Sequence, residues 1–363
     1  MRLRAFFYGI GLLLSVGLIT GCSAIDDDLS NCVTPTPPGP EPVPPTPEET
    51  LEMDYELQLV TNITTEMTTQ LNTTTEAYVI DALRAHLLNS IFTDYAHDVD
   101  LSFYDTENDK ERLSHDQHVM DASEKSYTLH LPMREYMHLA AANLINNPVV
   151  ELTGDERCPT SRLATISTGN DSINSHTTGL FTAREHMKLI DGISQTFHVR
   201  LYMANCAEAL VIEPRGHTVK DIKVYTTGFA TQFHINDSIY SFAEKSPIVR
   251  TVKLDTGGDD LCFCSVNFPS KDVEGMRTVI ETEEPFEETE ADQTLWQFRV
   301  YITLEDGTIT ETILSVREPQ RAGQFRIIKG YLGDKGEVKT ENQMVGVNVT
   351  LDWNDGGTHD VEL

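Results

Sequence analysis

The chain has 363 residues and is strongly acidic, with 57 Asp and Glu against 27 Lys and Arg side chains and a formal net charge of −30 at pH 7. A surface of this charge repels phosphate backbones and anionic lipid headgroups, which excludes nucleic acid as a partner. The chain is longer than those that usually fold around a single hydrophobic core, so we expect two domains.

The N-terminus has the organisation of a bacterial lipoprotein signal. Two arginines precede an apolar run over residues 5–18, which is shorter than the roughly 20 apolar residues of a membrane-spanning helix. The next residues, Ile19-Thr20-Gly21-Cys22, form the pattern at which lipoprotein signal peptidase cleaves. We expect residues 1–21 to be a signal peptide and Cys22 to carry lipid, including palmitate, whose buried CH₂ groups each contribute about 0.8 kcal/mol to membrane attachment. The alternative is an ordinary secretory signal followed by an incidental cysteine.

Residues 22–50 are predicted to be an acidic, proline-rich stalk. Asp26, Asp27 and Asp28 follow the cysteine closely, and eight prolines lie between Thr34 and Thr50. Proline removes backbone donors and favours polyproline II, which extends about 3.1 Å per residue. Such a segment would hold the rest of the chain away from the membrane.

The part of the chain after the stalk begins with a strand and a helix. Apolar and polar residues alternate over residues 55–63, the two-residue period of a half-buried strand. Thr73 and Glu76 match a capping box, and helical spacing of the following apolar residues predicts one amphipathic helix over 75–95, packed on a sheet. Residues 154–175 are expected to form a loop. Further strands are expected at 99–104, 127–131, 136–142, 178–184 and 197–212.

The remaining residues repeat this style without a second helix. Pro214-Arg215-Gly216 interrupts the pattern and predicts a boundary between an N-terminal domain, 51–216, and a C-terminal domain, 217–363. Many short strands and one helix predict an all-β fold of two tandem antiparallel β-sandwiches, with the helix in the first. Strands are expected at 220–225, 230–235, 248–254, 261–268, 296–304, 309–316 and 345–353.

The cysteines are expected to be mostly small buried apolar side chains. An exported chain permits disulfides, but an odd number remains once Cys22 is lipidated, so at least one thiol is free or pairs between chains. Cys262 and Cys264 lie two apart in a predicted strand and should face the same side. The sequence leaves the pairing open among the five, which are Cys32, Cys158, Cys206, Cys262 and Cys264.

No motif of an enzyme, metal site or cofactor site is present. Nucleotide-binding glycine patterns, HExxH, GxSxG and CxxC spacings are missing, and a calcium-like loop at 352–363 ends in Leu363 where Glu is needed. His115 and His118 are expected to be solvated histidines in a polar loop. Trp296 and Trp353 lie on the apolar faces of predicted strands, which leaves little aromatic surface for binding sugar. We expect no catalytic residue, no metal and no cofactor.

Several segments together resemble the FimB-type fimbrial anchor family of Bacteroidia. They are Cys22 with the acidic run and Cys32, the strand 136–143 and the segment 178–183. The resemblance implies two transthyretin-like β-sandwiches in a non-catalytic, surface-exposed lipoprotein of the outer membrane. It also implies that the protein anchors or terminates a fimbria, with fimbrial subunits as partners. The stalk is longer than this resemblance implies.

The resemblance leaves open whether the chain is an anchor or a polymerising subunit, and whether it donates a strand to a neighbour. Stalk subunits of such fimbriae lose their first strand to an Arg- or Lys-specific protease, but no Arg or Lys occurs from Ala5 to Leu83, and Arg84 lies in the predicted helix. We therefore expect an anchor or terminator rather than a polymerising subunit. Strand 345–353 could be donated to a neighbour, although completion of its own domain is favoured. The alternative function is a surface lipoprotein that binds glycan or host protein without a fimbria.

Overall fold

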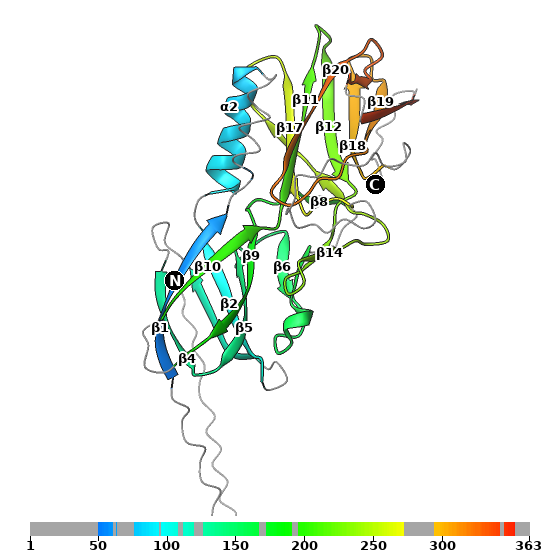
Figure 1. The fold of residues 1–363 in the computed structure, drawn as a ribbon. Helices are drawn as coiled ribbons and strands as arrows, with labels where there is room; N and C mark the ends of the chain where they lie inside the picture. The colour runs from blue at the N-terminus through cyan, green and yellow to red at the C-terminus, as the bar shows by residue number, and fades with distance from the viewer. Residues whose placement is uncertain are drawn as a thin grey trace, which may run out of the picture. The chain divides into compact units, whose positions relative to one another are not determined.

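The computed structural model describes residues 50–60, 63, 76–93, 96–107, 112–119, 126–166, 172–190, 195–271, 294–341 and 345–352. The described chain is mostly β-strand and forms all-β, sandwich-type domains with one short α-helix, as predicted (Figure 1). The expected signal peptide, Cys22, the stalk and Cys32 lie outside the described residues, as do Thr73 and Trp353.

The first sandwich is one seven-stranded sheet that bends over its own core. Its strand order is β3-β2-β5-β9-β10-β1-β4, and β9 and β10 share only two residue pairs, so the sheet bends between them. Tyr55 on β1 reaches His138 on β5 although three strand spacings of about 4.8 Å separate these strands within the sheet. The strands are β1 (Thr50–Val60), β2 (Asp98–Asp105), β3 (Arg112–Val119), β4 (Ser126–Pro132), β5 (Glu135–Ala142), β9 (Phe181–Lys188) and β10 (Thr196–Met203).

The second sandwich packs a five-stranded sheet against a six-stranded sheet. Leu210, Phe263 and Ile328 of the first sheet meet Val300 and Leu314 of the second in a buried cluster. The five-stranded order is β16 (Val252–Leu254), β17 (Leu261–Asn267), β11 (Cys206–Glu213), β20 (Phe325–Leu332) and β21 (Val338–Lys339). The six-stranded order is β22 (Val345–Asp352), β19 (Ile309–Val316), β18 (Trp296–Leu304), β12 (Val219–Thr227), β15 (Ile248–Arg250) and β8 (Ser172–Asn174).

A small four-stranded sheet covers part of the first sandwich. Leu152, Ala164 and Phe233 of this sheet join a cluster with Met137 and Leu139, which lie on the outer face of β5. The residues expected to form a loop at 154–175 therefore contain ordered strands, a correction to the sequence analysis. The elements are β6 (Val150–Thr153), η3 (Pro159–Ser161), β7 (Leu163–Ile166), β13 (Gln232–His234) and β14 (Ile239–Ser241).

The helix predicted over 75–95 is present as α2 (Ala77–His86), continued by a π-helical turn, η2 (Leu87–Ile91). It lies beside β17 and β11 (Figure 1). Val79, Leu83 and Leu87 are fully buried in one cluster with Ala209 and Cys264. The helix thus follows β1 in the chain but covers the outer face of the five-stranded sheet. The capping box was wrong, because Glu76 is itself the N-cap residue and its side chain makes no capping hydrogen bond.

Two features of the strands differ from the sequence analysis. The sheets are mixed rather than antiparallel, since the β1–β10, β11–β20 and β15–β8 pairs are parallel. The long strand predicted at 197–212 is two strands, because the chain leaves the seven-stranded sheet at Ala204 and Asn205 and enters the five-stranded one. The domain boundary proposed at residue 216 stays a prediction, and a cut there would separate β11 from both its neighbours, β17 and β20.

The contact between α2 and the sheet predicts that Gly258 is sensitive to substitution. A Cβ there would lie 2.4 Å from the Tyr78 ring, whose hydroxyl donates a 3.0 Å hydrogen bond to Asp260. Gly258→Ala should therefore lower the free energy of unfolding by about 1–3 kcal/mol in urea titrations. Gly346→Ala is the matched control, because its Cβ would meet no atom closer than 3.8 Å. Equal midpoints for the two variants would contradict this packing.

Candidate functional site

The strand that follows the stalk, β1, is the central strand of a three-strand layer. It pairs with β10 on one side and β4 on the other, with seven residue pairs in each ladder. Met53, Tyr55 and Leu57 point into the core and are at most 6% exposed. Removing β1 would break both ladders and open the core, so this strand is held from both sides.

A buried hydrogen bond joins β1 to the opposite layer. Tyr55 Oη lies 2.7 Å from His138 Nε2, and His138 Nδ1 lies 3.1 Å from the Ser102 carbonyl oxygen. A carbonyl can only accept, so Nδ1 carries the proton and Nε2 accepts from the tyrosine. The imidazole also stacks on Phe103 with 4.3 Å between ring centroids. Burial lowers the pKa of His138 to about 4, so it is neutral at physiological pH.

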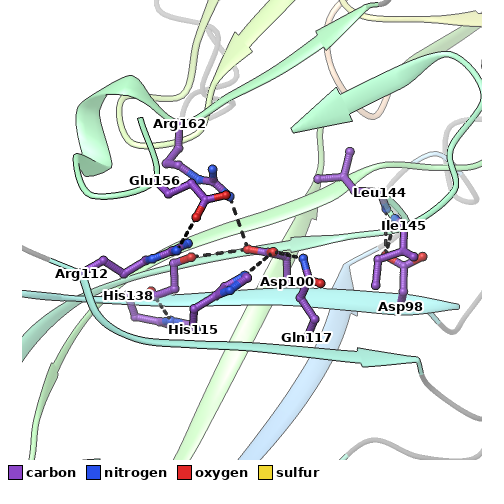
Figure 2. Close-up of polar contacts among 11 residues, drawn as sticks. Asp98, Asp100, Arg112, His115, Gln117, His138, Leu144, Ile145, Glu156 and Arg162 are labelled. Carbon is purple, nitrogen blue, oxygen red and sulfur yellow. Dashed lines mark hydrogen bonds and ion pairs between the residues drawn. The ribbon is translucent and has the colours of Figure 1, made fainter. Parts of the chain in front are cut away.

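A polar cluster lies on the outer face of β2, where the loop containing η3 meets the sheet (Figure 2). Asp100 Oδ2 accepts 2.7 Å hydrogen bonds from His115 and Gln117 of β3. Its Oδ1 accepts from Ser102 at 3.4 Å and lies 3.8 Å from Arg162 Nη2. Asp100 and Arg162 are both nearly fully buried, so their opposite charges compensate one another away from water.

Two further contacts fasten the same segment to the sandwich. Arg112 of β3 pairs with Glu156 at 2.5 Å, and Asp98 Oδ1 accepts 2.9 Å hydrogen bonds from the backbone N–H groups of Leu144 and Ile145 (Figure 2). Burial raises the pKa of Asp98, while these backbone bonds act in the opposite direction. These contacts join the loop that contains η3 and the turn after β5 to the sandwich, so we assign the cluster a structural role.

The structure places the histidines, the tryptophan and the cysteines that the sequence analysis singled out. His115 was wrongly placed in a loop, because it lies on β3 and binds Asp100; His118 is also on β3. Trp296 is 1% exposed and Cys206, Cys262 and Cys264 are fully buried, which confirms the core assignments. Cys262 and Cys264 lie under α2, as their two-residue spacing predicts. The described cysteines form no disulfide with one another, and the described residues contain no cluster of metal ligands.

A groove of about 850 Å³ lies at the N-terminal end of α2, over the part of the five-stranded sheet that the helix leaves open. Its lining includes Tyr78, Lys329 and Tyr331, with several carboxylates. The Arg215 guanidinium sits 3.5 Å above the Tyr331 ring centre and occupies that face. The Tyr331 face that Arg215 covers is therefore closed to a stacking sugar.

Among the described residues, no helix is long and apolar enough to cross a bilayer.

No family model and no curated protein matches this chain. Solved structures do align with it. The fimbrial anchor protein Mfa2 from Porphyromonas gingivalis aligns at 10% identity over 83% of this chain and 98% of its own, with a TM-score of 0.45. A fimbrial assembly protein from Parabacteroides distasonis aligns at 12% identity over 84% and 100%, with a TM-score of 0.38. A candidate adhesin from Bacteroides ovatus aligns at 14% identity over 90% and 99%, with a TM-score of 0.46.

The aligned proteins are fimbrial and adhesin-type proteins of Bacteroidia, the group that the sequence resemblance predicted. Their identities lie below 25% and their TM-scores below 0.5.

The buried imidazole predicts a loss of stability in acid. The unfolded chain takes up a proton near the ordinary histidine pKa of 6.5, whereas folded His138 does so only near 4. The contribution of His138 to the free energy of unfolding is therefore fully present above pH 6.5. It falls by about 3 kcal/mol as the pH drops towards 4. His138→Gln should reduce that fall in urea titrations between pH 7 and 4.5, with the remainder including buried His176, whose pKa burial lowers to about 3.

The matched control is His198→Gln, since the His198 side chain is 71% exposed and pairs with Glu56 at the surface. It should leave the pH dependence close to that of the wild type. An unchanged acid slope in His138→Gln would show that the buried imidazole does not control acid stability.

Proposed function

We propose that this protein is a non-catalytic, lipid-anchored outer-membrane protein that holds or terminates a fimbria at the cell surface. The observation that carries this proposal is the position of β1. The strand next to the predicted lipid stalk is built into the middle of its own layer, with ladders on both sides. Force from the stalk would reach the sandwich through main-chain hydrogen bonds along the whole strand.

The distribution of basic residues supports permanent retention of β1. No Arg or Lys occurs between Ala5 and Leu83, so a protease of that specificity finds no site from Ala5 to the end of β1. The first basic residue, Arg84, lies in the last turn of α2, where helical backbone resists cleavage. A chain that keeps β1 keeps its core covered, so it has no vacant strand position for a partner to fill.

The last described strand also serves its own domain. β22 pairs with β19 through eight residue pairs from Val345 to Asp352. This is the arrangement that the sequence favoured over donation of the strand to a neighbour. Contact with fimbrial subunits would then use surfaces of a closed fold, which suits an anchor or a terminator better than a repeating subunit.

Membrane attachment is tested by Cys22→Ala. Because the predicted acyl chains supply the apolar contact with the bilayer, the variant should move from the outer-membrane fraction to the soluble fraction. Cys158→Ala is the control and should stay with the membrane. Retention of Cys22→Ala at the wild-type level would refute lipid anchoring.

The anchoring role is tested by mapping the N-terminus of the protein on intact cells by mass spectrometry. Most molecules should begin at lipidated Cys22 and retain β1. Fimbriae isolated from cells that lack the protein should detach into the medium or grow to uncontrolled length. Molecules that begin mainly after Val60 would contradict an anchor and indicate a subunit processed for polymerisation.

A further inference from the structure

The interior of the second sandwich contains a buried polar group among apolar side chains. It consists of Glu208 on β11, Thr226 on β12, and Ser265 and Asn267 on β17. Each is at most 1% exposed. Leu210 and Phe263, which alternate with them on the same strand faces, belong to the apolar core between the two sheets. Polar groups in such a place lower stability unless they are fully satisfied, so their presence needs a cause.

The four side chains converge on the carboxamide of Asn267. Its Nδ2 donates to Glu208 Oε1 and lies 3.3 Å from Thr226 Oγ1 and 3.4 Å from Ser265 Oγ. Ser265 Oγ also donates to Glu208 Oε1 at 2.5 Å. Since the amide C–N bond is about 1.33 Å, Thr226 Oγ1 lies within about 4.6 Å of the amide carbon. Thr226 comes from one sheet and Asn267 from the other.

Two oxygens of this group have no hydrogen-bond partner within the described structure, Glu208 Oε2 and Asn267 Oδ1. A proton on Oε2 accounts for both, because the acid would then donate to Oδ1 while Nδ2 donates to Oε1. Such a cyclic acid–amide pair is the natural arrangement of a neutral carboxylic acid with a carboxamide. Burial supplies the reason for protonation, since it raises the pKa of Glu208 to about 8 and no cation is among the groups that shift it.

We propose that Thr226 and Asn267 form an intramolecular ester cross-link, with Glu208 as the acid and base at the reacting carboxamide. Thr226 Oγ1 attacks the Asn267 amide carbon while Glu208 gives its proton to Oδ1. The proton of the threonine hydroxyl passes directly to Nδ2, which lies 3.3 Å from Thr226 Oγ1. The C–N bond then breaks, ammonia leaves, and the proton on Oδ1 returns to Glu208 as the ester carbonyl forms. One hydroxyl and one carboxamide give one ester and one ammonia, so no oxidant or other reactant is needed.

The site has the features that such a reaction requires. Strands from the two sheets hold the nucleophile and the carboxamide side by side, which removes part of the entropy cost of bringing the two groups together. A protonated carboxyl beside the amide polarises its carbonyl and can carry the transferred proton. The surrounding apolar core keeps water away from the ester once it has formed. The bond would join β12 to β17 and so tie the two sheets of the sandwich together covalently.

The cross-link is tested by peptide mass spectrometry on the full-length protein, denatured and digested with trypsin. In the wild type, peptide 224–245 should be joined to peptide 254–271, lighter than their sum by one ammonia, about 17 Da. Hydroxylamine, which cleaves esters and leaves amides intact, should separate the pair. Wild-type peptides found separately, each at its full mass, would overturn the proposal without recourse to any variant.

Variants assign the roles. Thr226→Val keeps the side-chain volume and should give the two peptides unjoined, as should Glu208→Gln. Ser265→Ala removes the neighbouring hydroxyl and should still give the joined pair. Circular dichroism of each variant establishes that it is folded. A joined pair in folded Thr226→Val, or full joining in folded Glu208→Gln, would show that these residues do not have the proposed roles.

Discussion

The structure depends on one helix packed across two parts of the chain. α2 follows β1 of the first sandwich, yet its apolar side lies on the outer face of the five-stranded sheet of the second. Close approach is possible because the sheet presents small side chains there, including Ala207, Ala209 and Cys264, and because Gly258 leaves room for the Tyr78 ring. Without the helix, an apolar sheet face would be exposed to water. The two sandwiches therefore share a core and stabilise one another.

The buried imidazoles of His138 and His176 are neutral and lie where chain segments meet. His138 links the two layers of the first sandwich through Tyr55. His176 accepts from Asn205 at 2.6 Å, beside the residues where the chain passes from one sheet to the other. Both imidazoles resist protonation because they are buried. Neutral polar contacts thus fix the geometry of these junctions without the desolvation cost of a buried charge.

The sequence predicted strands well where one face is buried and the other is wet. Trp296 to Leu304 alternates strictly and was placed correctly. The strand β3 (Arg112–Val119) was not predicted, because its residues are mostly polar and show little apolar alternation. Two of them, His115 and Gln117, form hydrogen bonds with Asp100. Parallel pairing and the role of α2 were also missed, since local periodicity contains no information about which distant strand a segment joins.

For the candidate sites too, features set by local sequence were predicted and features set by distant contacts were not. Burial of Cys206, Cys262 and Cys264 followed from their strand context. The Glu208 group could not be found, because its members are separated in sequence and each looks like an ordinary polar residue. One signal was available in retrospect. Glu208 lies between Ala207 and Ala209 in an otherwise apolar strand, so its ionisable side chain is expected to be buried away from water.

The parallel pairing of β1 with β10 affects how the protein folds during and after its synthesis. β10 follows β1 by about 140 positions in the chain, and such distant contacts make folding slow. The first sandwich therefore cannot close until most of its sequence has been synthesised. While it stays open, the acidic charge of the chain would limit self-association of its exposed apolar segments.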